Sequence, residues 1–366
     1  MHKKKLSITP SWGFRTETDA LFEPVLFNLL KGIRDTGRLT LAAREAGISY
    51  RHAWNLINRG SDFFGLPLVR KHKGQGTELT PLGEVLLWSE QRIKARLGPQ
   101  IDSMASELNI QLQQLLEGAH PVLRLHASHG YAVALLPRYP DRLELKLQYC
   151  NTREALAALN RGDCDLASFH LPTSPALAEQ TLRYYHDDLQ AGDLRVIRFV
   201  TRKQGLIIPR GNPKGIEGLK DLARPHAKQE LLFINRNRDS GTHLLLTMLL
   251  REAGLDPADI RTAEQEEYTH TAVAAYVAAG MADLGFGVEA AARQFDLDFI
   301  EQASEHYLLI CHRDRLHQNT INQLLGLMRA PDFIKAIHDQ PGYAPDRCGE
   351  IVTLQELLAS QGKVAP

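Results

Sequence analysis

A loop at residues 235–243, Asn-Arg-Asn-Arg-Asp-Ser-Gly-Thr-His, places two arginines beside two hydroxyl side chains. The pattern predicts that this loop lies between a strand and a helix that begins near Thr242. The first turn of a helix presents free backbone N–H groups and the positive end of the helix dipole. Ser240 and Thr242 can add hydroxyl donors. Arg236 or Arg238 can add a full positive charge, so the loop suits an oxyanion.

A second interpretation of the same loop is structural. Asp239, Ser240 or Thr242 could cap the helix, with both arginines in solvent. The local pattern allows both interpretations, and the choice depends on which other residues reach the loop.

Residues 37–59 carry a second group of polar side chains, on a predicted helix-turn-helix. The alanines between positions 42 and 46 allow the two helices to approach closely. Gly47 permits the left-handed backbone of the turn, and Ser49 is a suitable N-cap for the second helix. The spacing therefore predicts two packed helices joined by a tight turn.

The second helix of this pair is predicted to have an apolar and a polar side. Ala53, Trp54 and Ile57 share the inward stripe. The polar side carries Arg51, His52, Asn55 and Arg59. Arg and Asn side chains can make paired hydrogen bonds to guanine and adenine edges in a major groove. An ordinary amphipathic hairpin with a solvated outer face would show the same pattern.

Residues 66–80 favour the DNA-binding interpretation of that helix. They indicate two short strands around a glycine-rich tip, with Arg70, Lys71 and Lys73 beside the tip. Thr80 and Pro81 then begin a long helical pattern, as cap and first helical residue. After an interruption, helical character is expected to resume over 101–116, which suits a linker and dimerisation helix.

Charge is divided unevenly along the 366 residues, although 43 Lys and Arg balance 43 Asp and Glu. Residues 1–100 hold 16 basic and 9 acidic residues, a net charge of +7, which leaves −7 for the remainder. A basic first part suits the phosphate contacts of DNA binding. No apolar run approaches the roughly 18 residues of a membrane helix, and no secretory signal is predicted, so we expect a cytoplasmic protein without a membrane partner.

The cysteines and histidines predict no metal site, and no cofactor is required. The cysteines are too widely spaced for a zinc or redox motif, so reduced thiols are expected at Cys150, Cys164, Cys311 and Cys348. The sequence contains no nucleophile elbow, P-loop or dinucleotide fingerprint. We therefore do not expect an enzyme.

From about residue 118 the pattern changes to an alternation of strands and helices, which is typical of a parallel α/β layer. Strands are expected at 122–127, 143–149, 166–170, 194–200, 205–208, 231–234, 282–285 and 306–312. Helices are expected at 131–136, 152–159, 242–252 and 271–279. Two α/β lobes with a cleft between them account for the length of this region.

Residues 5–117 resemble the DNA-binding half of the molybdate-responsive ModE-type regulators, and a related arrangement occurs in LysR-type regulators. The resemblance rests on residues 42–54, Ala-Ala-Arg-Glu-Ala-Gly-Ile-Ser-Tyr-Arg-His-Ala-Trp, and 79–83, Leu-Thr-Pro-Leu-Gly. It implies a winged helix-turn-helix in a homodimer or tetramer that reads a pseudo-palindromic operator in double-stranded DNA. The implied DNA-binding residues are Ser49, Tyr50, Arg51, His52, Asn55, Arg59, Arg70, Lys71 and Lys73.

Residues 121–312 resemble the periplasmic-binding-protein-like domain that occurs with such helix-turn-helix units. The segments that carry this resemblance are His126–Gly130, Gln204–Pro213, Thr269–Val273 and Gly280–Gly287. Residues 236–242 are similar to the Arg-Gly-Asp-Asp-Ser-Gly-Thr loop of periplasmic tungstate-binding proteins. The threonine-rich loop of those proteins is replaced here by Ala127-Ser-His, and Arg238 replaces an acidic residue.

This second resemblance implies a two-lobed α/β domain of type II, in which the ligand lies between the lobes at strand ends. One lobe would contribute Ser128, His129 and His170. The other would contribute Arg236, Ser240, Gly241, Thr242, Thr269 and His270. His170 and His270 could equally be packed or capping residues.

The expected chain is an α+β winged helix-turn-helix (1–80), a linker helix (81–117) and a two-lobed α/β type II periplasmic-binding-protein-like sensing domain (118–366, second lobe about 207–300). The expected function is a DNA-binding regulator that senses molybdate or tungstate and controls molybdenum- or tungsten-related genes. One alternative effector is an organic metabolite, a carboxylate or a pterin-type molybdenum cofactor, in an enlarged pocket lined by Tyr131, Tyr268 and several histidines. A less favoured alternative is an enzyme that regulates its own expression, with His129 or His170 as general base.

Overall fold

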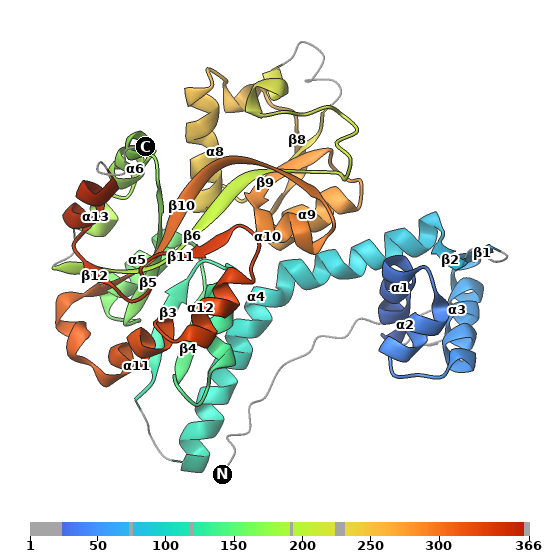
Figure 1. Ribbon diagram of the computed structural model, residues 1–366, viewed down its shortest axis with the longest axis horizontal. Coiled ribbons are helices and arrows are strands. Elements are labelled where there is room, and N and C mark those ends of the chain that lie inside the picture. Colours follow the sequence, from blue (N-terminus) through green and yellow to red (C-terminus); the bar gives the residue numbers. More distant parts are fainter. Residues whose placement is uncertain (1–23, 73–75, 118–120, 191–192, 224–230, 362–366) are drawn as a thin grey trace. The chain divides into compact units, whose positions relative to one another are not determined.

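The computed structural model describes residues 24–72, 76–117, 121–190, 193–223 and 231–361 (Figure 1). Tertiary contacts divide these residues into an N-terminal and a C-terminal unit, with the boundary between Ala95 and Arg96. Lys73, one of the predicted DNA-binding residues, lies outside the described residues.

The described residues of the N-terminal unit form three helices, a β-hairpin and the start of a fourth helix. The first elements are α1 (Val25–Thr36), α2 (Leu39–Glu45), α3 (Tyr50–Phe64), β1 (Val69–His72) and β2 (Gly76–Leu79). Apolar side chains of all three helices form one core, among them Leu30 and Ile57. The turn before α3 forms as predicted, because Gly47 has a φ of 69° and Ser49 Oγ accepts a hydrogen bond from His52 N at 3.2 Å.

Helix α4 (Pro81–Glu117) begins in the N-terminal unit and continues into the C-terminal unit. Thr80 Oγ1 accepts a hydrogen bond from Gly83 N at 3.2 Å, so the predicted cap and the predicted first residue are both confirmed. The expected interruption before residue 101 is wrong, since α4 continues through Pro99. Pro99 is buried, and its packing offsets the hydrogen bond that proline cannot make.

The C-terminal unit is built on a sheet whose described strands pair in the order β4-β3-β5-β10-β6-β9-β7-β8. These strands are β3 (Leu123–Ala127), β4 (Leu145–Tyr149), β5 (Leu166–Pro172), β6 (Leu194–Ile208), β7 (Phe233–Arg236), β8 (Thr262–Glu267), β9 (Leu284–Val288) and β10 (Asp298–His312). Two short strands, β11 (Tyr343–Pro345) and β12 (Ile351–Val352), also pair with β6.

The sheet has two parallel parts that two long strands connect (Figure 1). In the first lobe β3 pairs in parallel with β4 and β5, and in the second lobe β7 pairs in parallel with β8 and β9. The connecting strands β6 and β10 are antiparallel to each other and take part in both lobes. Each lobe has its own core, around Phe169 in the first and around Phe233 and Phe286 in the second. The predicted two-lobed α/β architecture is confirmed.

Helices accompany the strands of each lobe. Those of the first lobe are α5 (Thr152–Arg161) and α6 (Pro175–Tyr184), and those of the second are α8 (Gly241–Glu252), α9 (His270–Ala278) and α10 (Glu289–Gln294). After β10 follow α11 (Asn319–Met328), α12 (Pro331–His338) and α13 (Leu354–Gln361). Over the described ranges, no helix combines the length and the apolar character needed to cross a membrane.

Three expectations about this unit are wrong in detail. The sheet is mixed rather than parallel, because β6 and β10 run antiparallel to their neighbours. The strands expected at 194–200 and 205–208 form one strand, β6, since no glycine or proline separates them between residues 201 and 204. The helix expected at 131–136 is a 3₁₀ helix over Val133–Arg138, where Pro137 lacks the N–H of an α-helical turn.

Candidate ligand site between the lobes

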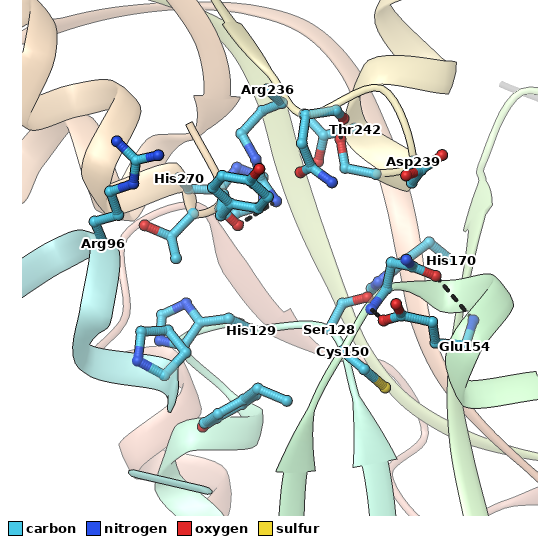
Figure 2. Close-up of a pocket in the computed structure, with 18 of the residues that line it drawn as sticks. Arg96, Ser128, His129, Cys150, Glu154, His170, Arg236, Asp239, Thr242 and His270 are labelled. Carbon is cyan, nitrogen blue, oxygen red and sulfur yellow. Dashed lines mark hydrogen bonds between the residues drawn. The ribbon is translucent and has the colours of Figure 1, made fainter. Parts of the chain in front are cut away.

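The C-terminal unit contains a cavity of about 290 Å³ that both lobes line. Nine residues predicted from the sequence to bind a ligand all lie in its lining: Ser128, His129, His170, Arg236, Ser240, Gly241, Thr242, Thr269 and His270. Figure 2 shows Arg236 and Thr242 on one side of the cavity, facing Ser128, His129 and His170 on the other. The fold thus brings together side chains from five separate segments.

The first lobe holds its contribution at the ends of β3 and β5. Ser128 directly follows β3, and its backbone is fixed on both sides. Its N–H donates a hydrogen bond to Ser168 Oγ at 2.8 Å, and its carbonyl accepts one from Tyr307 Oη at 2.7 Å. His170, within β5, packs edge-on against the Tyr307 ring, with 4.5 Å between ring centroids. Neighbouring strands therefore hold these two residues in place.

The second lobe contributes the loop between β7 and α8 and the start of α9. Ser240 Oγ accepts a hydrogen bond from His243 N at 3.1 Å and donates one to the Asn237 carbonyl at 2.7 Å. Ser240 is therefore the N-cap of α8, as the structural interpretation predicts, and it also lines the cavity. Thr269 caps α9 in the same way, accepting from Ala272 N at 2.9 Å.

Three helices begin at the cavity. The cap of α5 is Asn151, which forms a reciprocal capping box with Glu154, and both residues line the cavity. The caps of α8 and α9 are Ser240 and Thr269, which also line it. Because the N-terminus of a helix carries a partial positive charge and unpaired N–H groups, three of them favour an anion in this space.

Arg202, on β6, is a cavity residue that the sequence analysis did not identify. Its side chain is 2% exposed and forms an ion pair with Glu305 at 2.7 Å. Gln204 Nε2 donates a hydrogen bond to the same carboxylate at 2.6 Å. One guanidinium nitrogen, Arg202 Nη1, is buried and has no hydrogen-bond partner. Because β6 contains three other basic residues, Arg195, Arg198 and Lys203, its sequence pattern does not single out Arg202.

Arg236 is the second arginine of the cavity, and it lacks a matching carboxylate in the described chain. Its Nη2 donates a hydrogen bond to the Tyr268 carbonyl at 2.9 Å, whereas Nε and Nη1 are buried without a partner. Burial, and then repulsion by Arg202, lower the pKa of Arg236 below the ordinary arginine value. Burial and the neighbouring Arg202 therefore oppose this charge, and an anion beside it would offset that cost.

The three histidines of the cavity are neutral at pH 7. Burial and the two nearby arginines lower the pKa of His129 to about 4. The same causes place the pKa values of His170 and His270 well below the ordinary histidine value. Each of the three rings has one buried nitrogen without a hydrogen-bond partner. A neutral imidazole offers one N–H donor and one acceptor, so these rings can bind a ligand without adding charge.

Further lining residues come from segments that the sequence analysis did not connect with the site. They are Arg96, Pro99, Gln100, Tyr149, Cys150, Asn151, Glu154, Asn237, Asp239 and Tyr268. No cluster of three or more His, Cys, Asp or Glu side chains suited to a metal ion occurs among the described residues. The cavity is thus rich in hydrogen-bond donors and carries three guanidinium groups, of Arg96, Arg202 and Arg236, beside the carboxylates of Glu154 and Asp239.

The predicted DNA-binding residues of the N-terminal unit lie on α3 and the hairpin. Arg51, His52, Asn55 and Arg59 are exposed, opposite the buried Ala53 and Ile57. Ser49 and Tyr50, at the start of the same helix, are also exposed. Lys71 packs onto α3, with Nζ 3.7 Å from the Trp54 ring centroid and 3.2 Å from Tyr50 Oη. Arg70 forms an ion pair with Glu78 on the paired strand at 3.5 Å.

Comparison with known proteins agrees with the observed fold. The profile of the PBP superfamily domain matches residues 133–329, more than half of the chain. The fold is that of a two-lobed α/β domain, and its polar cavity lies between the lobes. The chain belongs to the PBP superfamily.

Two curated relatives and one solved structure are similar to parts of the chain. The uncharacterized protein YvgK of Bacillus subtilis (strain 168) is 28% identical over 205 residues, 56% of this chain and 64% of YvgK. The molybdenum-pterin-binding protein MopB of Rhodobacter capsulatus is 32% identical over 108 residues, 28% of this chain and 39% of MopB. The tungstate-binding protein TupA of Desulfovibrio alaskensis G20 is 16% identical with a TM-score of 0.45, over 62% of this chain and 99% of TupA. The chain thus spans less than two thirds of either curated relative.

Proposed function

We propose that the interlobe cavity binds a small oxyanion, molybdate or tungstate foremost, and that the protein is a binding protein rather than an enzyme. The observation that carries this proposal is the set of buried donors without partners, Arg202 Nη1 together with Arg236 Nε and Nη1, in one cavity. Buried charged donors are costly when unpaired, and a bound anion supplies the missing acceptors. The N-termini of three helices add to the same preference.

The choice of molybdate or tungstate rests on the sequence resemblances and on one relative. The loop at 236–242 is similar to that of tungstate-binding proteins, and the N-terminal region is similar to molybdate-responsive regulators. MopB, similar over 28% of this chain, is named a molybdenum-pterin-binding protein. All three similarities point to proteins that bind or respond to molybdenum or tungsten compounds.

We propose in addition that the N-terminal unit is a winged helix-turn-helix that binds double-stranded DNA. Helix α3 exposes Arg51, His52 and Asn55 on the side opposite its buried stripe. The β1–β2 hairpin directly follows α3 and carries Arg70 and Lys71, which would contact the phosphate backbone. Residues 1–100 have a net charge of +7, which favours a polyanion. Control of molybdenum- or tungsten-related genes follows if both proposals hold.

A homodimer through α4 completes this proposal. Met104, Leu108 and Leu115 lie on one side of α4 and are 66%, 38% and 83% exposed. An exposed apolar stripe of this kind suits a second copy of the same helix. Sedimentation of the wild type and of Leu115→Asp tests it, and a wild-type monomer at micromolar concentration would contradict it.

The ligand proposal is tested by calorimetric titration of the metal-free protein with molybdate and tungstate, with sulfate and phosphate as competitors. We expect selective binding by the wild type and no detectable binding by Arg236→Ala. Arg238→Ala is a matched control, because Arg238 belongs to the same loop, is 84% exposed and pairs with Glu266 outside the cavity. Equal affinity of the wild type and Arg236→Ala would show that the ligand binds elsewhere.

An organic effector is the second candidate, and the size of the cavity favours it. A cavity of about 290 Å³ has the volume of roughly ten water molecules, more than one small oxyanion fills. Tyr149 and Tyr268 in its lining could stack on a planar group. A carboxylate or a pterin-type molybdenum cofactor would then place its anionic group at Arg236. Displacement of bound molybdate by such a compound distinguishes the two candidates.

A further inference from the structure

We infer that helix α4 is itself part of the ligand site, with Arg96 as a direct ligand contact that links the occupied cavity to this helix. The inference rests on the proposed anion-binding function of the cavity. Arg96, Pro99 and Gln100 line the cavity at spacings of three and four residues, which places them on one side of α4. Figure 2 shows Arg96 beside the cavity, on the helix that borders it.

The first lobe holds α4 by hydrogen bonds to the edge strand β4. Ser106 Oγ donates to the Leu145 carbonyl at 3.1 Å and accepts from Leu147 N at 2.9 Å. Ser103 Oγ accepts from Tyr149 N at 2.9 Å. These two serines satisfy backbone groups that an edge strand would otherwise leave unpaired. The position of α4 along β4 is therefore fixed within the C-terminal unit.

Arg96 of α4 contacts the second lobe at Tyr268. The Arg96 guanidinium lies 5.6 Å from the centroid of the Tyr268 ring, within the range of a cation–π contact. The Tyr268 carbonyl in turn accepts the hydrogen bond from Arg236 Nη2. No carboxylate in the described parts of the chain forms an ion pair with Arg96. Its positive charge is thus available to an anion that Arg236 also contacts.

Pro99 makes this position of α4 sensitive to the ligand. Proline has no backbone N–H, so the helix lacks one hydrogen bond at the turn that lines the cavity. The same turn lies where the chain passes from the N-terminal to the C-terminal unit, since the boundary falls between residues 95 and 96. A ligand held by both lobes and by Arg96 therefore orders this turn of α4, which continues from residues 81–95.

The test compares molybdate and tungstate binding by the wild type, Arg96→Gln and Arg92→Gln in calorimetry. Arg92→Gln removes the same charge one helical turn earlier, at a residue that does not line the cavity. We expect roughly tenfold weaker binding for Arg96→Gln, partial recovery in Arg96→Lys, and less than twofold change for Arg92→Gln. Unchanged affinity in Arg96→Gln would overturn the inference and leave the proposed oxyanion site intact.

Hydrogen exchange on the same proteins tests the link to α4. Saturating molybdate should protect amides of residues 96–106 in the wild type. In Arg96→Gln this protection should disappear, while protection of residues 240–245 remains, because the anion still binds at Arg236. Protection of 96–106 that is equal in both proteins would overturn the link. A wild type that binds none of molybdate, tungstate, sulfate and phosphate would overturn the oxyanion assignment, and this inference with it.

Discussion

Two regions of this protein use arginine and histidine in opposite environments. On α3, Arg51 and His52 are exposed to solvent beside Asn55. In the interlobe cavity, Arg202 and His270 are only 2% exposed. Exposed cations are well hydrated and respond to the field of a polyanion, whereas buried cations need a fixed partner. The same residue types therefore suit DNA in one unit and a small anion in the other.

The comparison also separates the energetic roles of the two regions. Removing an exposed cation changes binding and hardly changes folding, because water solvates the charge equally well in both states. Removing a buried cation can leave its carboxylate partner unpaired in the interior, which destabilises the fold. Within the cavity, Arg202 has such a partner in Glu305, and no described carboxylate forms an ion pair with Arg236. The next four predictions use this contrast.

The largest expected effect is the loss of stability in the Arg202→Met variant. This change leaves Glu305 buried without its cation, and we expect a loss of about 3–5 kcal/mol in the free energy of unfolding. Urea unfolding followed by far-UV circular dichroism measures it. All three tryptophans lie within residues 1–95, so their fluorescence reports the N-terminal unit and should keep its midpoint.

Arg236→Met is the control for this experiment. It removes a half-buried cation that has no ion-pair partner among the described residues, so stability should stay unchanged or rise while anion binding is lost. Equal destabilisation by Arg202→Met and Arg236→Met would contradict the different roles that we assign to the two arginines.

The second effect is the pH dependence of stability of the C-terminal unit. His129, His170 and His270 have lowered pKa values in the fold, so the unfolded chain binds more protons as pH falls from 6.5 towards 4. Stability is therefore lost in this window, by up to about 1.4 kcal/mol per pH unit for each histidine. Urea midpoints at pH 7, 6 and 5 measure the slope. His129→Gln should reduce it, and an unchanged slope would mean that His129 does not contribute.

The third effect concerns sequence-specific DNA binding. We expect Arg51→Ala to weaken binding to a DNA site selected from a random pool by about 1–3 kcal/mol, with a much smaller loss on random DNA. Fluorescence anisotropy on both DNAs at one salt concentration measures the difference. Equal losses on the two DNAs would remove Arg51 from base recognition and leave it as a phosphate contact.

The smallest effect concerns the salt dependence of DNA binding. Lys71 is exposed and lies over Trp54, which suits a phosphate contact rather than a base contact. Lys71→Ala should weaken binding to all DNA sequences similarly and lower the slope of log K against log salt by about 1. Anion binding in the cavity should keep its salt dependence in this variant, which serves as the internal control.

Local patterns predicted several features of this protein correctly. Ser49 and Thr80 cap helices as predicted, and Ser240 does so as one of three candidate caps. In Ser49, for example, the cap depends on a hydrogen bond only three residues along the chain. The amphipathic stripe of α3 likewise follows from residue spacing within one helix. The lining residues Ser128 and Arg236 were predictable because ligands of open α/β sheets lie beyond strand ends.

Other features depended on contacts between distant segments. Arg202 meets Glu305 because β6 and β10 pair antiparallel in one register, in which these residues are direct partners. A register is set by turns and by the burial pattern of whole strands, so it could not be predicted from the residues around Arg202. The expected parallel layer was wrong for the same reason.

The sequence by itself determined where several helices begin, which side of α3 is apolar, and that a basic first part precedes an acidic remainder. These properties depend on neighbours within one or two helical turns and on composition. The tertiary structure alone decided that three arginines share one cavity, that three helix N-termini meet there, and that Arg96 of α4 reaches Tyr268. Such contacts join residues that are far apart in the sequence, and only the packing of both lobes and α4 brings them together.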